Sequence, residues 1–307
     1  MANENLYVET LTEIQIVKFK EHLVGQNWEF SELAYAHWKA RFNKTSVSAY
    51  KSGKVCIQGK GTKELVQFYV EPEITGEARF GNEDVYFETD NAEQLSPHAG
   101  IDESGKGDFF GPLVVCCAYT DETSAKALFK LGVKDSKAIK SDKKMKSLDE
   151  QIRKILKGKF AIITLGNEAY NRFYEKSRNL NNMLGWGHAR SLENLLEKVP
   201  SCKMAISDQF TKAAAVRSAL MEKGKKIKLI ERTKAEDDIA VAAASIIARA
   251  EFVRKMEALG KEYGLTLPKG ASSKVIECGK ELVKKFGSEV LSQVSKVHFK
   301  TTKDVLS

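Results

Sequence analysis

The chain has 307 residues, of which 42% are apolar and 29% are charged, so it can bury a full core and is long enough for two domains. No uncharged apolar run reaches the roughly 18 residues that a membrane helix needs. Four glutamates fall within the first 25 residues, where a signal peptide requires a basic start and an apolar stretch. These features argue against secretion and against contact with a membrane.

The cysteines point to a reducing environment. There are five, an odd number, and they show neither CxxC spacing nor a Cys/His pattern typical of zinc sites. We therefore expect no disulfide framework and no zinc, and we predict a cytoplasmic protein.

The charge is unevenly distributed. The formal net charge is +8 and the pI is near 9.0, which makes a polyanionic partner plausible. Residues 1–95 hold 10 basic and 15 acidic residues, net −5, and the remaining 39 basic and 26 acidic residues give net +13. Within the acidic part, residues 39–63 carry seven cations and no acid. The second part and this local patch are the two candidate surfaces for phosphate.

A polar stretch at residues 90–98, containing Pro97, separates two sets of predicted elements. We place the domain boundary there, giving domains 1–92 and 93–307. In the first domain, Thr12 and Gln15 have capping-box spacing, which predicts a helix to about Gly25.

The rest of the first domain reads as a small α+β unit. Residues 33–42 alternate between apolar and polar side chains, which indicates a strand with one buried face from Ala34 to Phe42. Shorter strands are predicted at 46–50 and 54–58, followed by a helix at 62–70 that Pro72 ends.

The exposed sheet face of the first domain offers a candidate nucleic-acid surface. Its cations and rings suit phosphates, sugars and bases, and they are Tyr35, His37, Lys39, Arg41 and Tyr50. The alternative is an ordinary solvated sheet face.

The second domain alternates between strand and helix patterns, which is typical of an α/β layer with its chemistry on loops at strand ends. The predicted strands cover residues 99–102, 111–119, 160–165, 203–208 and 226–231. The predicted helices cover 141–157, 167–177, 181–198, 210–223 and 236–260, with one or two amphipathic helices at 272–295.

An acidic pair, Asp102 and Glu103, ends the first of these strands and leads into a loop rich in glycine. Glycines allow a backbone to approach a ligand closely, and Lys106 adds a positive charge. Adjacent strand residues point to opposite faces, so the two acids can share a metal site only if the strand ends or bends there. An acidic turn without a ligand is the alternative.

Two further segments bring acids to strand or helix ends. Residues 203–208 form a short apolar strand ending in Asp208, and residues 232–238 place Glu236, Asp237 and Asp238 before an apolar helix. Acids at a helix start also cap free amides, which accounts for at least one of them. Four gathered carboxylates would repel unless hard cations such as Mg²⁺ or Mn²⁺ bound them. Two such ions can support phosphodiester hydrolysis.

Several motifs in a fixed order resemble bacterial ribonuclease HIII, the type 3 ribonuclease H. They are GIDESGKGDFFGPLVV from residue 100, GVKDSK from 132, LNNMLGWGHARSLENLL from 180, the strand ending in Asp208, TKAEDDIAVAAASIIAR from 233 and HFKTT from 298. The resemblance covers nearly all of residues 99–302. The first domain is similar only in layout to that family's small substrate-binding domain, which has a TATA-binding-protein-like fold.

The resemblance implies a ribonuclease H-like catalytic domain, with a central mixed sheet flanked by helices, that cuts the RNA strand of RNA–DNA hybrids with Mg²⁺ or Mn²⁺. It implies that Asp102, Glu103 and Asp208 are metal ligands. Glu236 matches the last active-site acid, with Asp237 and Asp238 as alternatives.

The resemblance also implies substrate contacts. The loop Ser104, Gly105, Lys106 and Gly107 looks like the segment that reads 2′-hydroxyls through backbone groups. Lys137 resembles a phosphate-contacting position. His188 is interpreted as a core or surface histidine without a role in the chemistry.

Three other functions fit parts of the sequence. A type 2 ribonuclease H would act at single ribonucleotides, and a non-cleaving hybrid-binding protein would need only the basic surfaces. Gly100 to Lys106 also fits the phosphate-loop pattern GxxxxGK, but Gly107 stands where that loop needs a hydroxyl. No obligate protein partner is indicated, and we expect a monomer.

Overall fold

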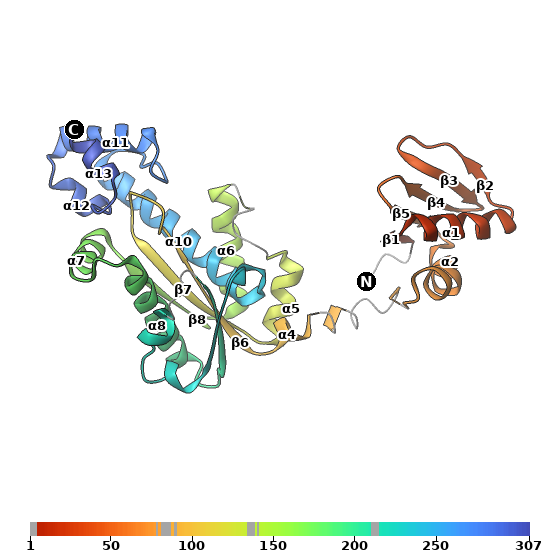
Figure 1. Ribbon diagram of the computed structural model, residues 1–307, viewed down its shortest axis with the longest axis horizontal. Coiled ribbons are helices and arrows are strands. Elements are labelled where there is room, and N and C mark those ends of the chain that lie inside the picture. Colours follow the sequence, from red (N-terminus) through yellow and green to blue (C-terminus); the bar gives the residue numbers. More distant parts are fainter. Residues whose placement is uncertain are drawn as a thin grey trace. The chain divides into compact units, whose positions relative to one another are not determined.

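The computed structural model describes residues 5–77, 79–80, 87–88, 91–133, 139, 141–209 and 215–307. The chain divides into two compact units, Met1–Asn91 and Ala92–Ser307 (Figure 1). Each unit has its own hydrophobic core.

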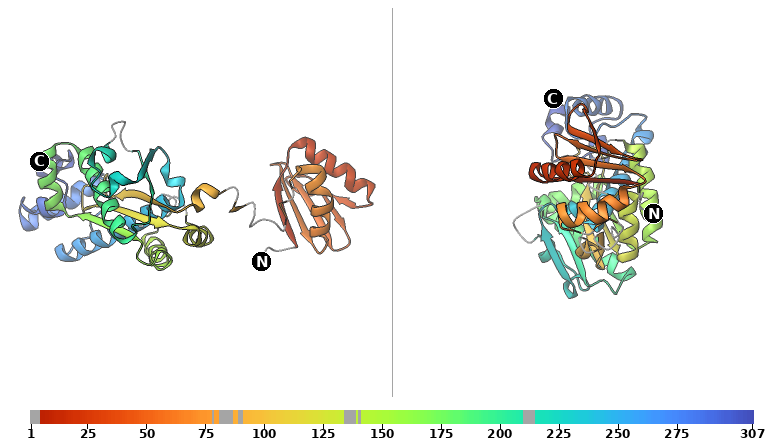
Figure 2. Two further views of the ribbon diagram at one scale, coloured as in Figure 1. Left: turned by 90° about the horizontal axis from the view of Figure 1, so that it is seen from below. Right: turned by 90° about the vertical axis from the view of Figure 1, so that its right-hand side faces the viewer.

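The first unit is a five-stranded antiparallel sheet with helical segments beside it (Figure 2). The strand order is β1-β5-β4-β3-β2. In chain order the elements are β1 (Leu6–Thr10), α1 (Glu13–Gly25), β2 (Glu29–Ser31), β3 (Ala36–Phe42), β4 (Thr45–Tyr50), β5 (Lys54–Gly59), α2 (Thr62–Leu65) and η1 (Val66–Thr75). Alternate residues of β4 are buried, and its Val47 packs in one cluster with Phe19 of α1 and Val70 of η1.

The predicted first helix is confirmed. It begins after Thr12, whose side chain accepts a hydrogen bond from the backbone of Gln15, and the Gln15 side chain accepts one from the backbone of Thr12. This reciprocal pairing satisfies two amides that a helix start otherwise leaves unpaired.

The predicted strand 33–42 is too long at its start. Tyr35 has a left-handed backbone with φ 61° and lies in a turn, with its side chain 86% exposed, so β3 begins only at Ala36. Phe42, expected on the buried face, is 43% exposed. Alternation alone did not reveal the turn because its residues happen to continue the apolar–polar pattern.

Pro72 does not end the helix that precedes it. Helical geometry passes through Pro72 as a π-helix and stops at Thr75, where Gly76 adopts a left-handed backbone and donates to the Glu71 carbonyl. A wider turn accommodates the missing proline amide, which the rule for α-helices does not foresee. Strands β1 and β2, of five and three residues, were not predicted because they are too short for a clear pattern.

The second unit is a mixed five-stranded sheet with helices, as predicted. Its strand order is β10-β9-β6-β7-β8, with β6–β9 and β9–β10 parallel and β6–β7 and β7–β8 antiparallel. The elements are α4 (Ala92–Leu95), β6 (His98–Ser104), β7 (Leu113–Thr120), α5 (Glu122–Leu131), α6 (Asp142–Leu156), β8 (Phe160–Leu165), α7 (Asn167–Ser177), α8 (Leu180–Lys198), β9 (Met204–Asp208), α9 (Ala215–Ala219), η3 (Gly224–Lys226), β10 (Lys228–Arg232), η4 (Ala235–Asp237), α10 (Ile239–Tyr263), α11 (Ser273–Phe286), α12 (Val290–Val294) and α13 (Thr301–Leu306).

Helices α8 and α10 cover opposite faces of this sheet (Figure 1). Ile101 of β6 packs in one cluster with Leu192 of α8. Gly100, the preceding residue, faces α10 so closely that an added Cβ would lie 2.1 Å from the Val241 backbone nitrogen. The small α10 side chains and Gly100 therefore bring helix and strand into close contact, and this fixes the start of α10 beside the end of β6.

The structure corrects three boundaries in this unit. Strand β6 continues through Ser104 instead of ending at Asp102, and β7 begins at Leu113. Helix α10 begins at Ile239, because residues 235–237 form a separate 3₁₀ turn. Part of the helix predicted at 210–223 lies outside the described residues, and α9 and η3 occupy 215–219 and 224–226.

The phosphate-loop alternative does not fit this topology. After the glycine loop the chain enters β7, which pairs antiparallel with β6, whereas a phosphate loop leads from its strand into a helix. Among the described residues, no helix combines the length and apolar character that crossing a bilayer demands.

Replacement of Gly100 by alanine is expected to destabilise the second unit by at least about 3 kcal/mol, because the new methyl group collides with helix backbone. Gly166→Ala is the matched control, since an added Cβ there meets nothing within 4 Å, and it should cost less than about 1 kcal/mol. Urea unfolding of both variants measures the difference. Equal stabilities would contradict the close packing of α10 on β6.

Candidate active site

A pocket of about 370 Å³ opens where β6, β9 and α10 come together. Four carboxylates from three separate stretches of sequence line it: Asp102, Glu103, Asp208 and Glu236. The glycine loop and helix α10 complete the wall with Ser104, Gly105, Lys106, Gly107, Val241, Ser245 and Arg249. The pocket therefore brings together acids that are more than a hundred residues apart in the chain.

The two adjacent acids reach one pocket although they sit on a regular strand. Strand β6 pairs with β9 only from Ala99 to Ile101, so Asp102 and Glu103 lie just beyond that pairing. Asp102 hydrogen-bonds Ser245 on α10, and Glu103 contacts His188 on α8. Strand β6 continues through both acids to Ser104, and helices on its two faces contact the two carboxylates separately.

Glu103 is held by two basic partners. His188 Nε2 lies 2.9 Å from one carboxylate oxygen, and Lys106 Nζ lies 3.5 Å from the other. Burial alone raises the pKa of Glu103, but the hydrogen bond and charge of His188, together with Lys106, outweigh it and lower the pKa. Glu103 is consequently the carboxylate kept ionised by the protein itself.

Asp102 has the opposite electrostatic environment. Burial and the neighbouring charge of Glu103 raise the pKa of Asp102, although hydrogen bonds from the Ser245 hydroxyl and the Glu103 amide favour its ionised form. A positive charge placed between the two carboxylates would relieve this repulsion.

His188 is fully buried, in agreement with the core interpretation, and it links three elements. Its Nε2 faces Glu103 and its Nδ1 lies 2.9 Å from the Ser207 hydroxyl of β9. The histidine touches an acid of the pocket and thereby orients it.

The remaining two carboxylates come from β9 and the 3₁₀ turn η4. Asp208 ends β9, and its Oδ1 accepts from the Ala235 amide at 3.3 Å. Lys234 has a left-handed backbone, φ 55°, at the turn that leads into η4. Glu236 then lines the pocket.

The other acids of that turn occupy different positions. Asp237 is exposed and does not line the pocket. Asp238 is 1% exposed and caps α10 by accepting from the amides of Ala240 and Val241. It also pairs with buried His98, 3.0 Å away. Of these three acids, Glu236 is the one that lines the pocket, and Asp238 has the helix-capping role expected for one of them.

The glycine loop needs its first glycine. Gly105 has φ 87°, and an added Cβ there would lie 2.3 Å from the Pro112 carbonyl oxygen and 2.8 Å from the Phe252 ring. Gly107, by contrast, is exposed and has open space around it. The loop therefore packs against α10 at one end and presents bare backbone at the other.

The pocket gathers acids without forming a ready coordination sphere. Among the described residues, no three His, Cys, Asp or Glu side chains are arranged to hold one ion. Glu103 instead faces His188 and Lys106, and Asp208 faces the Ala235 amide. The donor set itself, four carboxylates in one pocket, is the one that hard divalent cations prefer.

Sequence reasoning missed three residues of the site and its surroundings. His188, Ser245 and Arg249 stand at helical positions where each reads as ordinary core or surface. One signal in the sequence could have linked Ser245 and Arg249. They are four residues apart on the helix that follows the acids, so they share one helix face.

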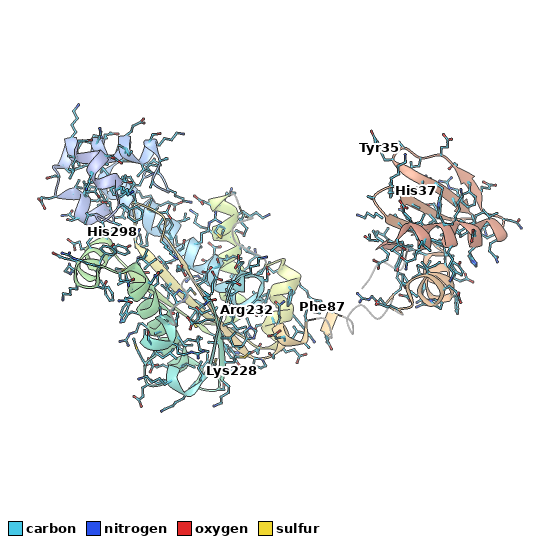
Figure 3. All side chains as sticks on the ribbon, in the orientation of Figure 1. Tyr35, His37, Phe87, Lys228, Arg232 and His298 are labelled. Carbon is cyan, nitrogen blue, oxygen red and sulfur yellow. The ribbon has the colours of Figure 1, made fainter. Side chains whose placement is uncertain are left out.

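The other predicted substrate contacts lie elsewhere. Lys137 is outside the described residues. Tyr35, Lys39 and Arg41 belong to the first unit, where Arg41 is exposed and Lys39 half-buried, and Figure 3 marks Tyr35 and His37 there.

The chain is similar to known proteins over nearly its whole length. Residues 99–302 match the family model described as ribonuclease HII, and residues 7–79 match a domain of unknown function (DUF3378). The chain is 39% identical over 300 residues to ribonuclease HIII of Protochlamydia amoebophila, covering 98% of this chain and 96% of that protein. It is 41% identical over 290 residues to ribonuclease HIII of Chlamydia trachomatis, covering 94% and 93%.

Solved structures agree. Bst-RNase HIII in complex with Mn²⁺ is 29% identical with a TM-score of 0.65, covering 98% of both chains. Aquifex aeolicus RNase H3 is 28% identical with a TM-score of 0.54, covering 96% of this chain and 100% of that one. The chain belongs to the ribonuclease HIII family. It is accordingly a metal-dependent endonuclease of the ribonuclease H type, acting on RNA–DNA hybrids.

Replacement of His188 tests its hold on Glu103. His188→Gln places an amide donor near the position of Nε2, whereas His188→Asn places one near Nδ1 and leaves Glu103 without it. We expect His188→Asn to lower kcat/KM about 10- to 100-fold and His188→Gln to lower it less. Steady-state cleavage of a labelled hybrid measures both, and equal losses would argue against orientation of Glu103 by the histidine.

The buried His98–Asp238 pair predicts a pH-dependent stability. Burial lowers the pKa of His98, but the hydrogen bond and charge of Asp238 outweigh it and raise the pKa above the ordinary 6.5. The pair's contribution is therefore fully present below pH 6.5 and is lost as the pH rises through the raised value. His98→Gln should cost about 1.5–3 kcal/mol at pH 6 and less at pH 9, measured by urea unfolding. A loss that does not change with pH would contradict an ionised pair.

Proposed function

We propose that the hybrid-cleaving activity of this chain resides in the pocket lined by Asp102, Glu103, Asp208 and Glu236. The observation that carries the proposal is their convergence at one pocket beside the glycine loop. Among the described residues, the pocket lining contains no cysteine, and neither of its serines is paired there with a histidine base. Water is therefore the proposed attacking group.

Divalent cations fit this donor set. Asp102, Glu103 and Asp208 would hold them, with Glu236 as the fourth acid of the reaction, and Mg²⁺ or Mn²⁺ are the ions that oxygen ligands of this kind favour. When bound, a pair of such ions activates water and stabilises the leaving oxygen of a phosphodiester. The Mn²⁺ complex of Bst-RNase HIII supports this choice of metal.

The chain's own residues position the substrate. Arg249 and Lys106 line the pocket with positive charge, which suits the phosphate next to the cleaved bond. In the Gly105–Gly107 stretch, Gly107 is exposed and has open space around it, so its backbone can reach a ligand with no side chain of its own in the way, which suits contact with 2′-hydroxyls of the RNA strand. Ser104 joins this loop to the acids. His188 keeps Glu103 oriented and ionised.

The first unit is proposed to strengthen substrate binding. Lys39 and Arg41 lie on β3 with Tyr35 in the turn before it, and this surface combines cations with an exposed ring. Lys137 is proposed to contact a phosphate as well. These contacts would hold the hybrid by its backbone and sugars instead of by base sequence.

A type 2 ribonuclease H activity, limited to single ribonucleotides, is the runner-up. The relatives that match along nearly the whole chain favour type 3, because the RNase HII structure from Archaeoglobus fulgidus covers only 65% of this chain. A non-cleaving hybrid-binding protein is disfavoured because its pocket would not need four acids.

We also propose that the enzyme works as a monomer in the cytoplasm. The five cysteines are all free thiols, and three of them are buried, which suits a reducing compartment. Size-exclusion chromatography with light scattering tests the monomer.

One assay tests the proposed function. Labelled RNA–DNA hybrid, all-RNA duplex and DNA with one ribonucleotide are each incubated with Mg²⁺, Mn²⁺ or chelator. We expect multiple cuts in the RNA of the hybrid with either metal and none with chelator. Asp102→Asn and Asp208→Asn should each lower the rate more than about 100-fold while hybrid binding persists.

Asp237→Asn is the matched control for these variants, because Asp237 is an exposed acid of the same region outside the pocket. It should keep wild-type activity. Cleavage restricted to the single ribonucleotide would support the type 2 function instead, and full activity of Asp102→Asn would overturn the proposed site.

A further inference from the structure

A fully buried lysine, Lys296, hydrogen-bonds residues 108–111, which directly follow the glycine loop Ser104–Gly107. Lys296 lies between α12 and α13 and is 0% exposed. Its Nζ donates to the carbonyl oxygens of Asp108 at 2.8 Å and Gly111 at 2.6 Å. Its backbone amide donates to the Phe109 carbonyl at 2.8 Å. One residue thus ties down three of the four positions from 108 to 111.

Neighbouring contacts complete the attachment. The Gly111 amide donates to the Val294 carbonyl, and the Phe109 amide donates to the Gly270 carbonyl, both at 2.9 Å. The Asp108 carboxylate accepts from the Gly270 amide at 2.6 Å. Residues 270–296 at the C-terminal side of the chain, here called the C-terminal segment, therefore hold residues 108–111 by hydrogen bonds. Residues 105–107, which come just before, line the pocket.

Burial of the charged Lys296 ammonium group is unfavourable, so packing alone does not explain a lysine at this position. Burial lowers its pKa to about 7, although the nearby Asp108 opposes this. Among the described residues no ion pair is formed with it, and its charge rests on two carbonyls and the Tyr170 ring, 5.5 Å away. An apolar side chain of similar volume would avoid the desolvation cost, so the lysine serves the geometry of the loop more than stability.

We propose that Lys296 is a positioning residue that sets the placement of the Gly105–Gly107 backbone over the pocket by anchoring the loop at residues 108–111. It acts through the loop and does not touch the substrate. This inference rests on the proposed function, in which that backbone contacts the 2′-hydroxyls of RNA. It gives the C-terminal segment, remote in sequence from the acids, a part in choosing the substrate.

Lys296→Met tests the proposal, with Lys300→Met as the matched control, because Lys300 is exposed on the same segment. Three quantities are measured: KM and kcat for a labelled hybrid, and Ki for an all-DNA duplex as competitor. Melting temperatures establish that the variants are folded. We expect Lys296→Met to raise KM for the hybrid about tenfold, leave Ki for the DNA duplex unchanged, and melt within a few degrees of wild type.

A purely structural role gives a different result. Partial unfolding would lower the apparent kcat in proportion to the folded fraction and leave KM unchanged, and that outcome would overturn the proposal. If Lys296→Met does not fold, Lys296→Gln, which keeps an amide donor, is measured in the same way. Failure of both to fold would make Lys296 a stability residue and equally overturn the proposal.

Failure of the proposed function is visible separately. It would appear as a wild-type enzyme that does not cut the hybrid. Failure of the Lys296 proposal would appear as an active wild type beside active variants whose KM is unchanged.

Discussion

The mutual repulsion of four carboxylates in one half-buried pocket is the constraint on which the rest of the site depends. Asp102 and Glu103 are neighbours on β6, and Asp208 and Glu236 face the same space. Such a group is stable only if each acid has a donor, a positive neighbour or a cation. The protein supplies His188 and Lys106 to Glu103, Ser245 to Asp102 and the Ala235 amide to Asp208. Divalent cations bound in the pocket would replace some of these contacts from protein donors.

The scaffold meets that constraint by close packing. Gly100 lets α10 lie against β6, so Ser245 and Arg249 stand beside the strand end. On the other face, α8 brings His188 to Glu103. The two helices contact the adjacent acids from opposite faces of one strand, and both acids line the same pocket without a break in the sheet. The loop that follows is anchored at both ends, by Phe252 near Gly105 and by Lys296 near Gly111.

Hydrophobic patterns predicted the alternating strands and most of the helices of the second unit because those patterns are long, as in α8 and α10, whereas the mixed sheet was implied by the family resemblance. It failed where a local feature interrupted a pattern. Tyr35 continues the alternation of β3 yet lies in a turn, and Pro72 sits inside a π-helix instead of ending the helix. Asp102, Glu103 and Asp208 stood out because carboxylates at strand ends are conspicuous, whereas Glu236 was separated from its acidic neighbours only by the family resemblance. His188 did not stand out, since a histidine within a helix gives no hint of a partner 85 positions away. Long-range contacts of this kind depend on tertiary packing, which periodicity does not report.

Asp102, Glu103 and Asp208 are engaged by protein donors in this structure, and we propose that together with Glu236 they gather around divalent ions in the working enzyme. Anomalous X-ray diffraction from crystals soaked in Mn²⁺ tests it most directly. We expect a manganese peak within coordination distance of Asp102, Glu103 and Asp208, with the Glu103 carboxylate rotated toward the ion. Peaks confined to other parts of the surface, with the pocket empty at saturating Mn²⁺, would contradict it.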